Sequence, residues 1–511
     1  MTYYLKTFCF TSLLLLGNFM PGFCQTWHQQ VDYQIDVRVD EKANTVQARA
    51  RVRYANHSLD TLKQIYFRIA WHGRPPQVSA KYSVFSVQQN GVAIDFKILE
   101  SKPLSDFSPQ SLSQSLLEIK LSRPLLPGDA DVYTIAWQAD IPQYSAGCGS
   151  NSSSGVDYAF TNWYPQVCVY DPMGWRLGSP FEPDSSNEFA SFKVEITLPQ
   201  RYMVAATGTL TNADAIGYGY ENQGVAIKPN YGLITVWKFQ AEQVREFAWA
   251  ADPEWQHDKK VFRNGLMLHA FYFKNENQLA SLETVLRNYE RTTFPCLLPQ
   301  LSVLQMGESR VPAPMLLFEG GIVPQLDEAI SWGFQDELLK SIYLLRQFRY
   351  VIGNEAFRKG LAAISRRYQY SRPPAAECIY LFERSSGLEL DWLWEQHWNS
   401  RTQVDYGIET VKADGSNASI IELKKVGGTI LPVVLEIMYA DSTAEQHYIP
   451  VDLLRAGLPN GFQAVAQPAW PLSINKYTLK LAKPMSVIKS IVIDPLFLSG
   501  DVDRQNNRKD F

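Results

Sequence analysis

The sequence predicts a multidomain α+β protein in which a helical middle segment separates two β-rich parts. From residue 31 to about 250 the apolar residues alternate with polar ones, which is typical of half-buried strands. From about 275 to 400 they recur at helical spacing, and after residue 406 strand patterns return. The 511 residues fit about three domains of ordinary size. Because 46% of the residues are hydrophobic and 20% are charged, the composition is that of a folded globular protein.

The first 24 residues have the pattern of a signal peptide. Lys6 precedes a short apolar run at 8–16, and the small residues Gly22 and Cys24 occupy the third-last and last positions before a cleavage site. The run is too short to span a bilayer as a mature helix. We therefore expect an exported protein, periplasmic or secreted, without a transmembrane helix after cleavage. Lipid attachment at Cys24 is the less favoured alternative, because bulky Phe23 precedes it.

Residues 25–250 are predicted to form a β domain. The alternating runs 31–39 and 46–54 are separated by a polar turn and predict a hairpin. The second run carries Arg49, Arg51 and Arg53, which we interpret as the solvent face of a sheet, with a polyanion site as the less favoured alternative. Further strands are predicted at 64–70, 117–121, 133–138, 192–198 and 234–239. A net charge of −4 gives no electrostatic support for nucleic-acid binding.

Residues 251–405 change to a mixed pattern. A short strand-like run, Met315 to Phe318, is followed by glycines, by Pro324 and by a long helical pattern. We expect one nearly continuous helix from about 326 to 352, closed by Gly353. Asn354 is predicted to cap the next helix.

The last helix of this middle part is rich in tryptophan. Trp392, Trp394 and Trp398 could form a cation-binding cage, but packing in a core is the favoured interpretation. After residue 406 the runs 429–439 and 486–495 are rich in β-formers, and they predict a C-terminal β-sandwich over 406–511.

Four cysteines remain after removal of the signal peptide: Cys148, Cys168, Cys296 and Cys378. None forms a C-x-x-C pair, so a zinc knuckle is disfavoured. Cys148 and Cys168 bracket a loop rich in Gly and Ser, and they either form a disulfide or remain two unpaired thiols. The sequence leaves these two alternatives open, because it does not fix the Cα separation.

Several ordered stretches resemble the alanyl-aminopeptidase-like gluzincin metallopeptidases (peptidase family M1) of bacterial type. They are Tyr54–His72, Asn162–Arg176 with its Trp-Tyr-Pro and Gly-Trp, Phe189–Leu210, Arg245–Trp255 and the ending Ile493–Asn507. The resemblance implies a saddle-like N-terminal β-sheet domain at 25–250, a reduced thermolysin-like α/β domain at 251–405, and the β-sandwich at 406–511.

The residues that carry out catalysis in that family have no counterpart here. The chain has seven histidines, and no two are separated by three to five residues, so the zinc-binding His-Glu-x-x-His helix is missing. Pro312 stands where the family has the Glu that binds the substrate's amino terminus, and Leu339 stands where it has the proton-donating Tyr. The remnant of the site region comprises Glu308, Pro312, Glu319, Asp327 and Glu328.

The resemblance and these losses together predict an exported M1 homologue without catalytic residues, without a metal site and without a cofactor. We expect it to bind a peptide or protein or to act as a scaffold. Two alternatives remain open: an active zinc aminopeptidase that uses unrecognised ligands, and a decaying truncated family member.

Overall fold

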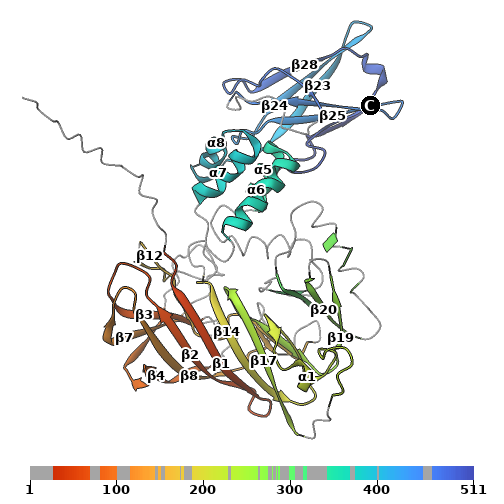
Figure 1. Cartoon of the computed structure of the whole chain (residues 1–511). Helices are drawn as coiled ribbons and strands as arrows, with labels where there is room; N and C mark the ends of the chain where they lie inside the picture. The colour runs from red at the N-terminus through yellow and green to blue at the C-terminus, as the bar shows by residue number, and fades with distance from the viewer. Residues whose placement is uncertain are drawn as a thin grey trace, which may run out of the picture.

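The computed structural model describes residues 27–69, 81–100, 115–143, 148–150, 156–172, 174–177, 187–227, 232–262, 265–273, 279, 283–284, 286–287, 298–304, 315–318, 342–368, 375–399, 402–452 and 463–511. In this part the chain consists mostly of β-strands in several sheets, with few helices (Figure 1). The predicted multidomain fold with both strands and helices is confirmed at this level. The predicted signal peptide lies outside the described residues.

The largest sheet has eight strands in the order β16-β17-β14-β1-β2-β8-β4-β5. These strands are β16 (Thr209–Leu210), β17 (Ile234–Val244), β14 (Ala190–Pro199), β1 (Gln30–Asp40), β2 (Thr45–Ala55), β8 (Ala130–Asp140), β4 (Tyr82–Gln89) and β5 (Val92–Ala93). The predicted hairpin is confirmed, since β1 and β2 pair antiparallel from Gln30↔Ala55 to Asp40↔Thr45. On its other side β1 pairs in parallel with β14.

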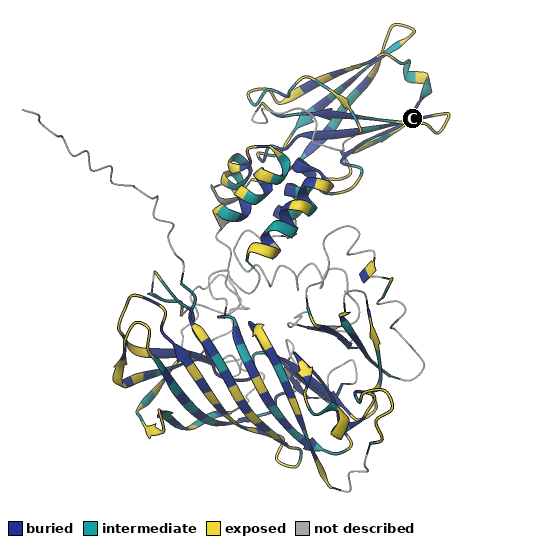
Figure 2. Ribbon diagram, viewed as in Figure 1, coloured by how far each residue is buried: buried dark blue, intermediate teal, exposed yellow. Residues whose placement is uncertain are grey.

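The two faces of this sheet follow the alternation in the sequence. Val31, Tyr33, Ile35 and Val37 of β1 are buried, whereas the residues between them are exposed or half-buried. Figure 2 shows this alternation as blue and yellow bands across β1, β2, β14 and β17. The arginines of β2 are all exposed, which confirms that they lie on the solvent face.

Three smaller sheets belong to the same N-terminal part. They are β11-β3-β7-β6, β15-β18-β10-β9 and the pair β12-β13. Their strands are β3 (Leu62–Ile69), β6 (Phe96–Glu100), β7 (Ser115–Leu125), β9 (Cys148–Ser150), β10 (Tyr158–Phe160), β11 (Gln166–Val167), β12 (Tyr170–Asp171), β13 (Gly174–Trp175), β15 (Met203–Ala206) and β18 (Trp249–Asp252). A four-residue helix, α1 (Ala213–Ile216), precedes β17. Buried residues of the first two small sheets join one core with the inner face of the eight-stranded sheet.

A further four-stranded sheet, β19-β20-β21-β22, follows along the chain. Its strands are β19 (Gln256–Val261), β20 (Met267–Tyr272), β21 (Gln300–Leu304) and β22 (Leu316–Phe318). Phe271, Leu304 and Leu316 extend the N-terminal core into this sheet.

The four helices of residues 342–399 form a second core with the C-terminal strands. These elements are α5 (Ile342–Ile352), α6 (Asn354–Arg367), α7 (Ala375–Ser386), α8 (Asp391–Asn399), β23 (Tyr406–Asp414), β24 (Ala418–Lys425), β25 (Val433–Tyr439), β26 (Ala444–Ile449), β27 (Val465–Ala466), β28 (Lys476–Leu481), the 3-10 helix η2 (Met485–Val487), β29 (Ile488–Ile493) and β30 (Arg508–Asp510). The strands form the sheets β23-β24-β28 and β27-β26-β25-β29-β30. The backbone N–H of Val434 donates to the Tyr350 hydroxyl at 3.0 Å, which ties α5 to β25.

The described residues of 251–405 thus divide between two cores, because β19–β22 pack with the N-terminal sheets and α5–α8 pack with the C-terminal ones. The boundaries at 250 and 405 remain predictions. No helix in the described parts of the chain is long and apolar enough to cross a membrane.

Two helix predictions are tested at Gly353. Helix α5 ends at Ile352, and Gly353 follows with φ +79°, as expected for a left-handed closing residue. The earlier part of the predicted helix, 326–341, lies outside the described residues. Asn354 was expected to be an N-cap, but it is the first helical residue and Gly353 occupies the cap without a side-chain hydrogen bond. Trp392 and Trp394 pack against the second core, in agreement with the favoured interpretation.

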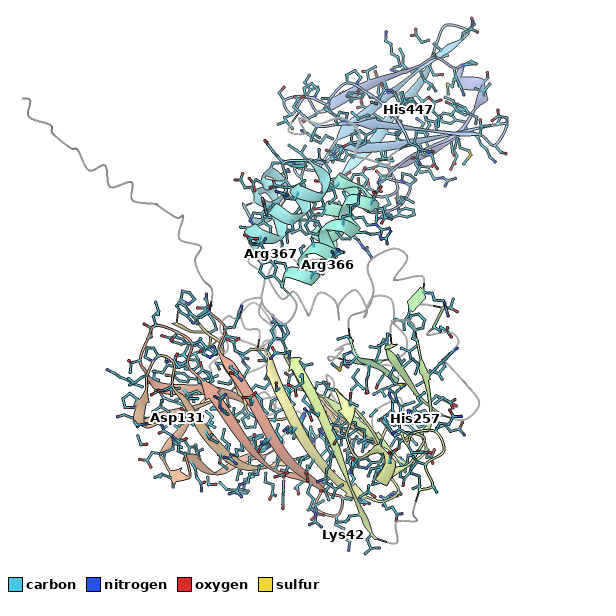
Figure 3. The ribbon with its side chains drawn as sticks, viewed as in Figure 1. Lys42, Asp131, His257, Arg366, Arg367 and His447 are labelled. Atoms are coloured by element: carbon cyan, nitrogen blue, oxygen red, sulfur yellow. The ribbon has the colours of Figure 1, made fainter. Side chains whose placement is uncertain are left out.

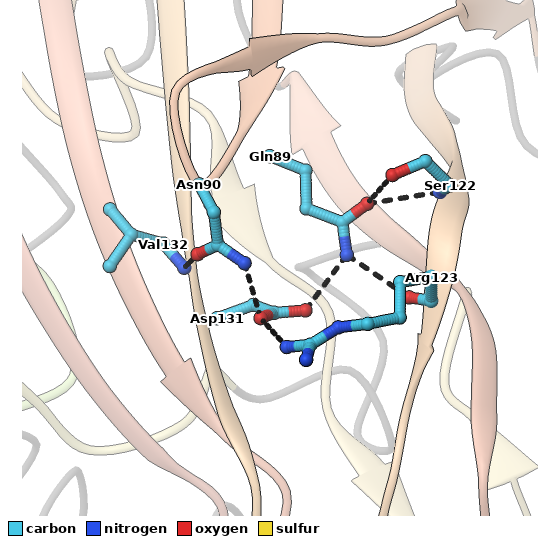
Figure 4. A network of polar contacts seen from close by, with 6 residues as sticks. All are labelled: Gln89, Asn90, Ser122, Arg123, Asp131 and Val132. Carbon is cyan, nitrogen blue, oxygen red and sulfur yellow. Dashed lines mark hydrogen bonds and ion pairs between the residues drawn. The ribbon is translucent and has the colours of Figure 1, made fainter.

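A buried polar network joins the edge of the eight-stranded sheet to β7 (Figure 4). The buried Asp131 carboxylate accepts hydrogen bonds from Gln89 Nε2 at 2.8 Å, Asn90 Nδ2 at 2.6 Å and Arg123 at 2.9 Å. Gln89 Oε1 in turn accepts from the backbone N–H and the hydroxyl of Ser122. Burial alone would raise the pKa of Asp131, but the hydrogen bonds from Asn90, Gln89 and Arg123 outweigh it and lower that pKa.

We predict that Asp131→Ala lowers the free energy of unfolding by about 3 kcal/mol at pH 7, because it removes the acceptor shared by three donors. Because its pKa is lowered on folding, Asp131 stabilises the folded state at pH values above the pKa that it has in the unfolded chain. This contribution is lost as the pH falls through the pKa of the folded state. Urea unfolding should therefore show the difference between wild type and variant shrinking below about pH 4. Asp129→Ala, at an exposed turn position, is the control and should change little. An equal loss at all pH values would contradict the role of the charge.

Candidate functional site

The sheet β19–β22 carries the edge at which the sequence predicts the site region. Strands β20, β21 and β22 are adjacent and parallel, so their carboxyl ends lie at one edge. In open α/β sheets ligands bind beyond the carboxyl ends of the strands. The chain leaves β21 at Leu304 and β22 at Phe318, shortly before Glu308 and Glu319 respectively. The predicted strand at 315–318 is confirmed as β22.

The five residues of the predicted remnant, Glu308, Pro312, Glu319, Asp327 and Glu328, all lie outside the described residues. Their assignment therefore stays a prediction from the sequence.

A histidine pair that the sequence did not single out lies in the same sheet. Nε2 of His257 on β19 and Nδ1 of His269 on β20 are 2.8 Å apart, and Nδ1 of His257 is 2.9 Å from the carbonyl oxygen of Tyr218. Because a carbonyl only accepts, Nδ1 of His257 carries the proton, and its Nε2 accepts from His269. The rings of Tyr220 and Phe271 lie within 4.5 Å of the His257 ring, centroid to centroid.

Both imidazoles are held in the neutral form. Burial lowers the pKa of His257 to about 4 and that of His269 to about 3, and the nearby charge of Lys259 acts in the same direction. The Lys259 ammonium donates to the carbonyl oxygens of Tyr220 and Glu221 at 2.7 Å each. The histidine pair and Lys259 therefore hold the loop 218–221 against the sheet.

This pair by itself does not fit a catalytic zinc site. Such a site needs three protein ligands and an open position for water, whereas the pair supplies two ligands whose facing nitrogens bind each other. Among the residues that the structure describes, no group of three His, Cys, Asp or Glu side chains could hold a metal ion. His257 and His447 lie in different parts of the molecule (Figure 3). The lack of a zinc site remains a prediction, because residues 305–314 and 319–341 are outside the described part.

Glu246 is a second buried titratable group that the sequence did not identify as special. Its carboxylate accepts a hydrogen bond from the backbone N–H of Asn162 at 2.5 Å, and burial raises its pKa to about 7. A carboxyl group that titrates near neutral pH is suited to proton transfer. The neighbouring Arg245 guanidinium lies over the Phe189 ring, 4.3 Å from its centroid.

Cys168 bears on the two cysteine alternatives without deciding between them. Its thiol is free and fully buried, in contact with Tyr66 and Leu116. The thiol packs in a small apolar cluster, and pairing with Cys148 stays a prediction, because the side chain of Cys148 is outside the described part. Burial raises the pKa of this thiol, which favours its unreactive protonated form.

We predict that the double variant His257→Phe/His269→Phe flattens the pH dependence of stability between about pH 6.5 and pH 4. Unfolded histidines bind protons near pH 6.5, whereas the folded pair binds them only near pH 4 and below. Wild-type stability therefore decreases as the pH is lowered from 6.5 to 4. Urea unfolding at several pH values measures this slope. His57→Phe, at an exposed position, should keep the wild-type slope. An unchanged slope in the double variant would show that the pair is not the titrating group.

We also predict that Glu246→Gln gains stability relative to wild type as the pH rises. Between about pH 4 and pH 7 the unfolded chain releases the Glu246 proton while the folded chain keeps it, so wild-type stability falls through this window. The variant should gain on the order of 2 kcal/mol over wild type from pH 5 to pH 8. Thermal unfolding at both pH values is the measurement, with exposed Glu254→Gln as control. A constant difference between variant and wild type would refute the raised pKa.

Comparison with known proteins gives information on the fold. No protein-family model and no curated protein matches the sequence. Among solved structures, aminopeptidase A of Legionella pneumophila in complex with aspartic acid matches with a TM-score of 0.56 at 12% identity. The match covers 93% of this chain and 59% of the Legionella chain.

An M1 zinc metallopeptidase from Deinococcus radiodurans matches with a TM-score of 0.45 at 12% identity, over 70% of this chain and 91% of that one. At these identities the matches show similarity of fold alone. The described chain has a multidomain, mostly β fold that is similar to that of M1 aminopeptidases.

Proposed function

We propose that this protein is an exported M1 metallopeptidase homologue that has lost zinc binding and peptide hydrolysis, and that it binds a peptide or protein as a non-catalytic scaffold. The observation that carries the proposal is the histidine inventory. The segment from Gln305 to Ile352, where an active relative has its zinc-binding helix, contains no histidine. Carboxylates alone make a poor zinc site, because Zn²⁺ prefers nitrogen and sulfur ligands.

The loss affects the whole catalytic machinery at once. Zinc ligands, general base, the Glu for the substrate amine and the proton-donating Tyr are all missing from their expected places in the sequence. Enzymes lower the activation free energy of a reaction by at least about 8 kcal/mol, and a protein without these groups would lose most of that effect on peptide hydrolysis. A binding role requires none of these groups, since fold and chemistry are separable.

The retained sheet supports a binding role. Strands β21 and β22 remain anchored in the N-terminal core through Leu304 and Leu316, and their carboxyl ends meet at one edge. An edge of this kind accepts ligands in many α/β proteins. We therefore assign the peptide or protein ligand to this edge.

The alternative of an active aminopeptidase needs imidazole ligands from distant segments. The pair His257 and His269 is the specific place to test it, because the two rings already lie together. Using them as ligands would require breaking their mutual hydrogen bond and adding a third ligand.

We predict that the purified mature protein contains no stoichiometric zinc after dialysis and releases no amino-terminal residue from dye-labelled peptides. Elemental analysis and mass spectrometry of the peptides are the measurements, and fluorescence anisotropy should show that part of a mixed peptide pool binds and stays intact. An active M1 aminopeptidase processed in parallel is the positive control.

His257→Ala/His269→Ala is the matched variant for the alternative. If wild type held zinc and cleaved peptides, and this variant lost both while staying folded, the distant-ligand aminopeptidase would replace our proposal. A wild type that neither cleaves nor binds any peptide would leave the loss of activity standing but refute the scaffold role.

A further inference from the structure

A row of six polar residues crosses the solvent face of the eight-stranded sheet. From one strand to the next, its members are Gln240 on β17, Lys193 on β14, Gln34 on β1, Arg51 on β2, Thr134 on β8 and Gln88 on β4. Each member is paired directly with the next in the strand register. We call this set the central row.

Two adjoining hollows lie along the central row. One has a volume of about 420 Å³ and the other about 610 Å³. Every member of the row lines at least one of them, and Gln34, Arg51 and Val132 line both. The row therefore forms the floor of both open hollows, which we together call the groove.

The rows on either side of the groove carry charges of both signs, several of them paired. On one side Arg53 forms an ion pair with Asp32 at 3.2 Å. On the other side Lys238 forms an ion pair with Glu195 at 2.7 Å, and Arg49 lies opposite Asp36 in the register.

The central row is different because it contains two cations and no carboxylate. Neither Arg51 nor Lys193 forms an ion pair with a residue in the described part of the chain. The pKa of Glu242 is lowered mainly by hydrogen bonds from Ser191 and Gln240. The charge of Lys193 makes a smaller contribution in the same direction. The groove thus offers two unpaired cations flanked by amide and hydroxyl groups.

We propose that the central row binds an acidic polysaccharide that carries carboxylates at intervals along its chain. Arg51 and Lys193 are separated by two strand spacings, which is about 10 Å. A carboxylate on every second sugar ring can meet both cations, and the amides of Gln34, Gln88 and Gln240 can bind sugar hydroxyls. A guanidinium binds a carboxylate through two parallel hydrogen bonds, so Arg51 would fix the position of one sugar carboxylate of the polysaccharide.

Other anionic polymers fit the groove less well. Single-stranded nucleic acid binds through exposed aromatic platforms, whereas the one aromatic side chain in the lining, Tyr33, is buried. The carboxylates Asp32, Asp36 and Glu242 on both flanks would repel a closely spaced row of phosphates. An extended peptide pairs with a free strand edge, but β1, β2 and β14 each have partners on both sides.

The test uses the mature protein and a fluorescein-labelled hyaluronan oligosaccharide, in which glucuronate alternates with a neutral sugar. Fluorescence anisotropy at low salt should show saturable binding that weakens as salt is added, since both cations are exposed. Neutral dextran should not bind. Polyglutamate and single-stranded DNA serve as competing anions and should bind less tightly than hyaluronan.

Arg51→Gln and Lys193→Gln should each weaken hyaluronan binding by at least about fivefold, and the double variant should abolish it. Arg38→Gln is the matched control, because Arg38 is exposed on the same sheet face but lines neither hollow. The melting temperatures of all variants should stay close to wild type, which separates lost binding from misfolding.

Three results would overturn the proposal: no hyaluronan binding by wild type, equal binding by the double variant, or an equal loss in Arg38→Gln. Tighter binding of DNA or polyglutamate would refute the choice of ligand class. The readout is independent of zinc and peptides, so its failure leaves the proposed function untouched.

Discussion

The parallel pairing of β1 with β14 is the contact on which the N-terminal part of the molecule depends. It aligns Val31 with Ala190 and continues to Arg38 and Thr197. On the inner face this register stacks the rings of Tyr33 and Phe192, whose centroids are 4.9 Å apart. The Tyr33 hydroxyl also accepts a hydrogen bond from the backbone N–H of Val167, which fixes the loop leading out of β11. On the outer face the same register brings Gln34 beside Lys193 and so completes the polar groove.

The buried titratable groups differ because their hydrogen-bond partners differ. Asp131 receives three hydrogen bonds to its carboxylate, and these overcome the cost of burial, so its charged form is favoured. Glu246 accepts a hydrogen bond from the backbone N–H of Asn162, but its pKa rises, because this donor does not replace the water that burial removes. His257 and His269 bind each other in the neutral form, which burial and the nearby Lys259 both favour. For Asp131 the hydrogen bonds decide the direction of the pKa shift, whereas for Glu246 and the two histidines burial decides it.

A fold similar to that of M1 aminopeptidases is physically compatible with the proposed loss of catalytic residues. Among the described residues, the two cores are built from strand and helix side chains. Leu304 at the end of β21 and Met315 and Leu316 at the start of β22 belong to the N-terminal core, so the sheet is secured on both sides of residues 305–314. A fold stabilised in this way does not need the metal or its ligands, and function has to be argued from the site alone.

The sequence by itself determined the elements and their faces, because alternation and helical spacing are local signals. It predicted the β1–β2 hairpin, the exposed arginines of β2, the strand β22 and the end of α5 at Gly353, and the missing histidine pattern could be read directly. It did not predict that β1 pairs with β14, that His257 meets His269, or that Cys168 is fully buried. In the sequence the arginines form a pattern along a single strand, whereas the residues that line the groove come from six neighbouring strands. Only the tertiary structure decided these features, since the register between strands far apart in the chain is fixed by the packing of the whole sheet.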